Sequence, residues 1–294
     1  MSLAEICVIS LIKNLKKMDT NSVKQSVVAG YGKLAKSASS GFFSKLFACC
    51  DANQHAAKVG EKIGYSKETL ASIPENSNLG VSCGNPSELA QINEGETVVD
   101  LGSGAGFDAF IVAPLVTKIG KVIGVDLSDD MLDLARRNAQ KGNYEHVEFV
   151  KGDIEDLPLA DEIADHIVSN CVINLSLHKD KVYKEAFRVL KKGGKLSVSD
   201  IILEQELPDV VKHSLAGYMA CISGAEKIED YLKYIRDAGF TDINIASKSS
   251  FPLELMLADP QIAKIAEQMN VALDSQEAKE MASRVVSVSI TATK

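Results

Sequence analysis

The chain has 294 residues, of which 46% are hydrophobic and 24% charged, and its mean hydropathy is +0.02. This is the composition of a globular protein with one large domain or two ordinary ones, and no stretch of the sequence is apolar for long enough to cross a bilayer. The net charge of −8 argues against a nucleic-acid partner, which needs a basic surface, and disfavours binding to an anionic membrane.

The N-terminus contains one short apolar run, Ile6 to Ile12. Glu5 precedes this run and Lys13 follows it, whereas a secretory signal carries its positive charge before the run, so we expect a cytoplasmic protein. In that compartment the six cysteines should be mostly reduced. Their spacing fits neither a small disulfide scaffold nor a zinc site with paired CxxC motifs. The default interpretation of such dispersed cysteines is packing in the core.

The first third of the chain has a mixed pattern. Val23 to Lys36 has helical periodicity, and the small polar residues from Ser37 to Gly41 predict a loop after it. Phe42 to Cys50 is apolar and ends in two adjacent cysteines. Ser66 is a suitable N-cap for a further helix. Asn76 to Pro86 is rich in Gly, Asn, Ser and Pro and predicts a loop.

From Glu96 onward, short apolar segments alternate with helical patterns, which is typical of parallel βαβ units. We therefore predict an α/β fold, a Rossmann-like doubly wound and mostly parallel sheet with helices on both faces. The predicted strands are 97–101, 121–126, 146–150, 165–170, 195–202 and 242–246, and the predicted helices are 107–117, 129–141, 179–190 and 228–238. The tail has two further helical patterns, 253–269 and 276–284, and a candidate closing strand, 285–293.

This organisation divides the chain into three parts. Residues 1–65 form an N-terminal extension with a cysteine-bearing loop, and residues 66–246 form the Rossmann-like domain. Residues 247–294 form a C-terminal helical segment that could return to the sheet edge through its last strand.

The segment Val98 to Gly106 runs from a strand into a turn with three glycines and then into a helix. Such a turn brings the backbone and the helix N-terminus close to a ligand, although it also occurs as a plain tight turn. Asp126, at the end of the next strand, could bind ribose hydroxyls in a nicotinamide dinucleotide or in S-adenosylmethionine. Asp100 would repel a pyrophosphate but not a sulfonium. Gly152 to Pro158 adds a carboxylate and an apolar residue where an adenine could bind, which also favours S-adenosylmethionine.

This combination resembles the class I S-adenosylmethionine-dependent methyltransferases over about residues 95–202. The resemblance implies that Asp100, Gly102 and Gly104 line the methionine part of the cofactor, and that Asp126 holds the ribose. It also implies contacts from Asp153 and Ile154 to the adenine and a place for Asn170 near the transferred methyl. Asn170 could instead only satisfy backbone groups at the strand end. The predicted cofactor site is completed by Ser103, Leu127, Met131 and Gly152.

The surroundings of the cysteines resemble those of the arsenite methyltransferase (ArsM) family over about residues 20–240. The motifs that carry this resemblance are Ala29 to Ala35, the Cys49-Cys50 pair, Cys83-Gly84-Asn85-Pro86, Ser169 to Leu175, and Tyr218 to Ala225. The resemblance implies that Cys171 and Cys221 bind trivalent arsenic. It implies that Cys83 is a third thiol ligand or a redox partner, and that Cys49 or Cys50 takes part in reducing the product. For Cys7 no role is predicted.

Elementary chemistry supports thiols as the arsenic ligands. Arsenic(III) is a soft centre that prefers thiolates to imidazole or carboxylate. Three thiolates around it leave a lone pair that can attack a sulfonium methyl. Cys171 follows the end of a predicted strand, Cys221 follows the last parallel strand, and Cys83 lies in the loop before the first. We therefore expect these three cysteines to meet at one edge of the ligand crevice.

The sequence thus predicts an arsenite methyltransferase whose partners are arsenite or methylarsenite and a thioredoxin- or glutathione-like thiol reductant. A methyltransferase of an organic acceptor, such as a quinone precursor, would share the cofactor site but would not need the cysteines. A non-enzymatic thiol protein would bind arsenic or soft metals without consuming S-adenosylmethionine. A nicotinamide oxidoreductase is disfavoured by Asp100. Replacing Cys171 and Cys221 by serine separates the first two predictions.

Overall fold

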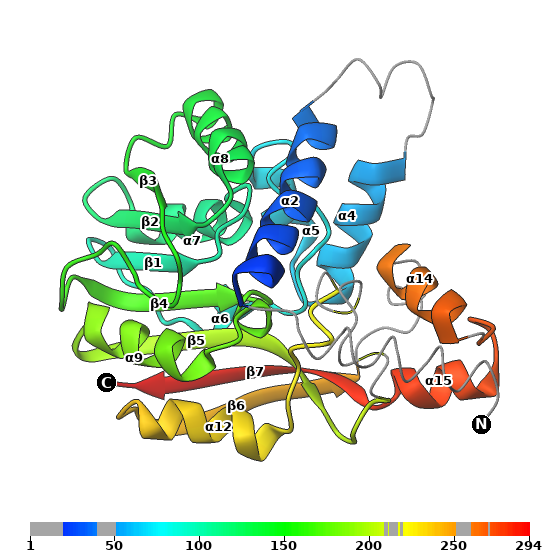
Figure 1. The fold of residues 1–294 in the computed structure, drawn as a ribbon. Coiled ribbons are helices and arrows are strands. Elements are labelled where there is room, and N and C mark those ends of the chain that lie inside the picture. The colour runs from blue at the N-terminus through cyan, green and yellow to red at the C-terminus, as the bar shows by residue number, and fades with distance from the viewer. Residues whose placement is uncertain are drawn as a thin grey trace.

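The computed structural model describes residues 20–39, 51–208, 211, 217, 220–250, 260–269 and 271–294. Its centre is a seven-stranded sheet in the order β3-β2-β1-β4-β5-β7-β6 (Figure 1). The strands are β1 (Thr97–Leu101), β2 (Lys121–Asp126), β3 (Val147–Lys151), β4 (Ala164–Asn170), β5 (Leu190–Leu203), β6 (Thr241–Ser250) and β7 (Val285–Thr293). The strands from β1 to β5 pair in parallel, whereas β7 is antiparallel to both β5 and β6.

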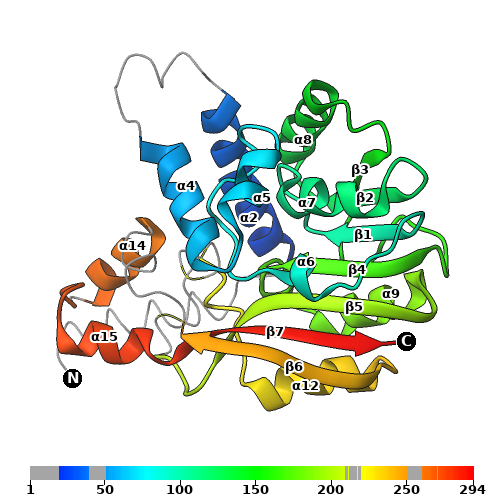
Figure 2. The same ribbon diagram turned by 180° about the vertical axis from the view of Figure 1, so that it is seen from behind.

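Helices cover both faces of the sheet (Figures 1 and 2). The helices around the sheet are α6 (Pro86–Leu89), α7 (Phe107–Val116), α8 (Asp129–Gly142), the 3-10 helix η1 (Ile173–Leu175), α9 (Lys179–Val189) and α12 (Ile228–Asp237). Buried side chains of α9 and α12 form one core with β1, β4, β5 and β7, and those of α7 and α8 form a second core on the other face. The loops that follow the carboxyl ends of the parallel strands line a pocket together with α2.

The remaining helices lie beside the carboxyl ends of the parallel strands (Figures 1 and 2). They are α2 (Thr20–Ser39), α4 (Asp51–Lys62), α5 (Lys67–Ser72), α14 (Pro260–Met269) and α15 (Gln276–Ala282). Ser66 caps α5 as predicted, since its hydroxyl accepts a hydrogen bond of 3.0 Å from the Thr69 N–H. Within the described ranges, no helix is long and apolar enough to span a membrane.

The structure differs from the sequence prediction in two strands and one helix, apart from shifts at other element ends such as the longer β6. The closing strand β7 forms, but it lies between β5 and β6 rather than at the edge, because it pairs along its whole length with β5. Strand β5 begins at Leu190, so the glycine pair expected before the strand lies inside it. Helix α2 continues to Ser39, into the predicted loop. The predicted apolar segment before Cys50 and the start of the predicted 253–269 helix lie outside the described residues.

Candidate active site

A pocket lies at the carboxyl ends of β1, β2 and β4. The topological switch point of the sheet is between β1 and β4, because the chain adds β2 and β3 on one side of β1 and β4 and β5 on the other. Open α/β sheets bind their ligands at this point. Every residue predicted to bind the cofactor lines this pocket: Asp100, Gly102, Ser103, Gly104, Asp126, Leu127, Met131, Gly152, Asp153, Ile154 and Asn170. The structure therefore brings the predicted set together, and the role of each residue stays a prediction.

The glycine turn after β1 lets the backbone form the wall of the pocket. Gly102 has φ of +68°, and a Cβ there would lie 2.3 Å from a methyl of Val172. Gly104 has φ of +52°, and its N–H donates a hydrogen bond of 2.9 Å to the Asp126 carboxylate. The other Asp126 oxygen accepts one of 2.8 Å from the Ser128 N–H. These bonds, with a further one from the Leu127 backbone, fix the carboxylate at the end of β2.

Two buried carboxyl groups, those of Asp100 and Asp108, line the pocket. Asp100 is 2% exposed, and its Oδ2 has no hydrogen-bond partner among the described residues. Burial, and then the charges of Asp108 and Asp126, raise the pKa of Asp100 well above its usual range. Burial also raises the pKa of Asp108 to about 6, although Tyr65 and Asn170 donate hydrogen bonds to it. A cation in the pocket would favour the ionised form of both groups.

The Asn170 side chain ties the end of β4 to the Cys83 loop. Its oxygen accepts a hydrogen bond of 3.1 Å from the Cys83 N–H, and its amide donates one of 2.8 Å to the Gly84 carbonyl. The same amide lies 3.0 Å from Asp108 and 3.1 Å from the Tyr65 hydroxyl. Asn170 thus satisfies backbone groups and also lines the pocket, so both interpretations of this residue remain compatible with the geometry. Asp108 and Tyr65 were not predicted from the sequence. For Asp108 the signal was a carboxylate in the first turn of the helix after the glycines.

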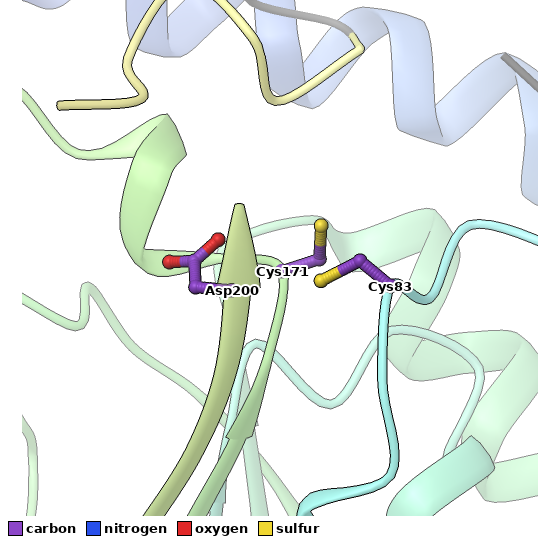
Figure 3. A group of neighbouring side chains, drawn as sticks. All are labelled: Cys83, Cys171 and Asp200. Carbon is purple, nitrogen blue, oxygen red and sulfur yellow. The ribbon is translucent and has the colours of Figure 1, made fainter. Parts of the chain in front are cut away.

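Three thiols meet beside this pocket. The Sγ atoms of Cys83 and Cys171 and a carboxylate oxygen of Asp200 all lie within 4.8 Å of one another (Figure 3). The Cys221 thiol donates a hydrogen bond of 2.9 Å to the Cys171 carbonyl. The three cysteines are 2–6% exposed. Of the three, Cys171 lines the pocket, and the role of the cysteines as arsenic ligands stays a prediction.

The thiols are held in a constrained and apolar environment. Cys171 and Cys221 have φ of 61° and 59°, in the left-handed region that costs a residue with a Cβ about 1 kcal/mol or more. Burial raises the pKa of Cys83 to about 11. The hydrogen bond to Cys221 lowers the pKa of Cys171, but Cys83 and burial raise it more, and Cys171 and burial raise the pKa of Cys221. At neutral pH and without a ligand all three are therefore protonated thiols.

Asp200 was not singled out from the sequence, although a carboxylate directly before the apolar run Ile201 to Leu203 of a central strand is a signal. It is fully buried in β5 and accepts three hydrogen bonds of 2.9 Å, from Asn174, the Ile201 N–H and the Tyr231 hydroxyl. Burial raises its pKa to about 6. These donors fix its carboxylate beside the thiols.

Helix α2 covers the pocket. Lys24 forms ion pairs of 2.6 Å with Asp153 and 2.7 Å with Glu155. Gly32 lies so close to α8 that a Cβ would be 2.6 Å from an Asp130 oxygen. Tyr31 lines the pocket, and its hydroxyl lies 3.9 Å from the Cys221 sulfur. The predicted N-terminal extension thus supplies part of the site. Cys49 and Cys50 lie outside the described residues, so their predicted redox role stays a prediction.

Comparison with known proteins identifies the family. A family model described as a methyltransferase domain matches residues 92–239. The chain belongs to this methyltransferase-domain family. An arsenic(III) S-adenosylmethionine methyltransferase from Chlamydomonas reinhardtii superposes with a TM-score of 0.57 at 29% identity, over 81% of this chain and 72% of that chain. The predicted Rossmann-like class I methyltransferase fold is confirmed.

The chain is also similar in sequence to arsenite methyltransferases from two microorganisms. The arsenite methyltransferase of Halobacterium salinarum is 40% identical over 200 residues, which are 68% of this chain and 51% of that protein. The arsenite methyltransferase of Aquipseudomonas alcaligenes is 38% identical over 226 residues, which are 74% of this chain and 62% of that protein. These matches confirm the resemblance predicted from the cysteine motifs. The matched segment spans only about half to three fifths of the length of these relatives.

Proposed function

We propose that this methyltransferase-domain protein transfers a methyl group from S-adenosylmethionine to arsenic(III) held by Cys83, Cys171 and Cys221. The observation that carries the proposal is that the buried sulfurs of Cys83 and Cys171 lie within 4.8 Å of each other beside the pocket, while the buried Cys221 thiol bonds to the Cys171 carbonyl. An organic acceptor gives no reason for three thiols at this place. The similarity to arsenite methyltransferases of two microorganisms supports the same acceptor.

The pocket fits S-adenosylmethionine. The Asp100 oxygen without a partner among the described residues lies where an ammonium or sulfonium would compensate its charge. Asp126, a carboxylate held at the end of β2 in the pocket lining, suits ribose hydroxyls, and Ile154 offers an apolar contact for the adenine. When bound, S-adenosylmethionine supplies a methyl group on a positively charged sulfur. The carbon of this methyl group is the electrophile that a soft nucleophile attacks.

The residues of the chain then have mainly positional roles. Each thiol displaces one arsenic hydroxyl, and its proton leaves with that hydroxyl as water, so no separate base is required. Three sulfur ligands leave the arsenic lone pair on the remaining side, and Cys171, which lines the pocket, would hold the arsenic next to the cofactor. Holding two reactants in this way removes much of the entropic barrier. Helix α2 lies over the pocket and contributes Lys24, Val27 and Tyr31 to its lining.

The finer parts of the proposal concern substrate and partner. Arsenite has three hydroxyls and can bind three thiols, whereas methylarsenite has two hydroxyls and can bind two. After transfer the arsenic is formally pentavalent, and its return to the trivalent state needs two electrons. Two cysteine thiols that join in a disulfide would supply them, and an external thioredoxin- or glutathione-like thiol would reduce that disulfide again. Cys49 or Cys50 is a candidate for this step, which suits a reducing compartment such as the cytoplasm.

The test measures S-adenosylhomocysteine formation by the reduced protein, with and without arsenite. We expect arsenite-dependent turnover in the wild type and in Cys7→Ser, and its loss in Cys171→Ser while S-adenosylmethionine still binds. If S-adenosylmethionine binds but arsenite and methylarsenite give no turnover, the arsenic acceptor is wrong and an organic acceptor replaces it. If arsenite binds tightly but S-adenosylmethionine does not, the protein is a thiol-binding protein and not an enzyme.

A further inference from the structure

The thiol site contains an oxygen ligand that arsenic does not require. A carboxylate oxygen of Asp200 and the sulfurs of Cys83 and Cys171 lie within 4.8 Å of one another, and all three residues are buried (Figure 3). Arsenic(III) is satisfied by thiolates alone. Two sulfurs and one oxygen in a buried cluster match a different ion, because Zn²⁺ and similar divalent cations accept both ligand types in a tetrahedral arrangement.

The carboxylate is already positioned as a metal ligand would be. One Asp200 oxygen accepts hydrogen bonds from Asn174 and the Ile201 N–H, and the other accepts one from the Tyr231 hydroxyl. In metal sites, ligating carboxylates are held by such outer hydrogen bonds, which orient them and tune affinity. The oxygen bonded only by Tyr231 keeps a lone pair for an ion.

We propose that Cys83, Cys171 and Asp200 bind a thiophilic divalent cation of the zinc class, with its fourth position open to water. Bonds of about 2.3 Å to sulfur and 2.0–2.2 Å to oxygen place neighbouring tetrahedral ligands roughly 3.5–4 Å apart, so side-chain rotations of about 1 Å are enough to close the site. The two thiols release two protons to the buffer, and the cation neutralises most of the resulting charge. Cys171 lines the pocket, which gives the ion a route to the site.

The cation site and the arsenic site share two thiols but differ in their third ligand. Arsenic uses Cys221, whose thiol is engaged with the Cys171 carbonyl, whereas the cation uses Asp200. Cation binding does not depend on the proposed function. One consequence does rest on the proposed function, namely that the cation excludes arsenite and inhibits its methylation.

The test titrates the reduced full chain with Co²⁺, without S-adenosylmethionine. A tetrahedral sulfur-ligated cobalt ion gives sulfur-to-metal charge-transfer bands in the near ultraviolet and intense visible bands, and Zn²⁺ should displace it. We expect one equivalent to bind to the wild type and to Cys221→Ser. Asp200→Asn and Cys83→Ser should each weaken binding by about 10-fold or more. Equal affinity of Asp200→Asn and the wild type, or no tetrahedral spectrum, overturns the proposal.

Folding controls and an arsenite arm complete the test. If Asp200→Asn does not fold, Tyr231→Phe keeps the carboxylate and removes one donor, and a several-fold loss of Co²⁺ affinity supports the site whereas unchanged affinity refutes it. Arsenite binding should show the opposite pattern, with loss in Cys221→Ser and retention in Asp200→Asn. Because the cobalt titration needs no turnover, it decides the cation site even if arsenite is not methylated. A failed titration with intact arsenite turnover refutes only the cation site.

Discussion

Replacing Asn170 by alanine should both destabilise the protein and release the Cys83 loop. The substitution removes the acceptor of the buried Cys83 N–H and the donor to the buried Gly84 carbonyl. A buried polar group left unpaired costs about 1–3 kcal/mol. Because Asn170 borders the pocket, water can enter and replace part of this pairing. We therefore expect a loss of about 2–3 kcal/mol, or a Tm lower by roughly 4–12 °C.

The assay is urea unfolding of the reduced protein without ligands, with the denaturation midpoint and its slope measured separately. Asn138→Ala is the matched control, because the buried Asn138 amide makes one hydrogen bond, of 3.2 Å, to the Ala105 carbonyl. Its loss should be about 1 kcal/mol. The Cys83 thiol should also react faster with a thiol reagent in Asn170→Ala than in the control. If Asn170→Ala is no less stable than Asn138→Ala, the amide does not hold the loop as inferred.

Three further predictions follow from individual contacts. Gly102→Ala should lower S-adenosylmethionine affinity at least about 10-fold in calorimetry, because its Cβ clashes and its φ is left-handed, whereas Gly193→Ala, with φ of +78° but open space, should bind normally. Burial raises the pKa of Asp200 from 3.8 to about 6, so the folded state is progressively destabilised as pH rises through this interval. The stability advantage of the wild type over Asp200→Asn should therefore fall by up to about 3 kcal/mol between pH 4 and 7 in urea unfolding. Lys24→Met should speed hydrogen exchange in α2, because Lys24 pairs with a carboxylate that is 7% exposed, while Lys36→Met, at a lysine side chain that is 70% exposed, should change it little.

The sequence by itself determined the alternation of elements and the place of the cofactor pocket. The strand Lys121 to Asp126 forms as predicted, and the helix after the glycine turn begins at Phe107 as predicted. Such elements follow from local periodicity, since buried strands and amphipathic helices each repeat apolar residues at their own spacing. The turn from Gly102 to Gly104 was readable for the same reason, because it needs residues that tolerate positive φ.

The tertiary structure alone decided which distant groups meet. Asn170 lies 87 positions from Cys83, and their contact depends on the packing of β4 against the loop before β1. Asp200 became a neighbour of two thiols only through the pairing of β4 with β5. Strand β7 entered the sheet between β5 and β6 because nearly all of its side chains are buried there, whereas β6 is largely exposed at the edge. Local patterns specify the elements, but contacts over such separations are set by the free energy of burying whole faces together.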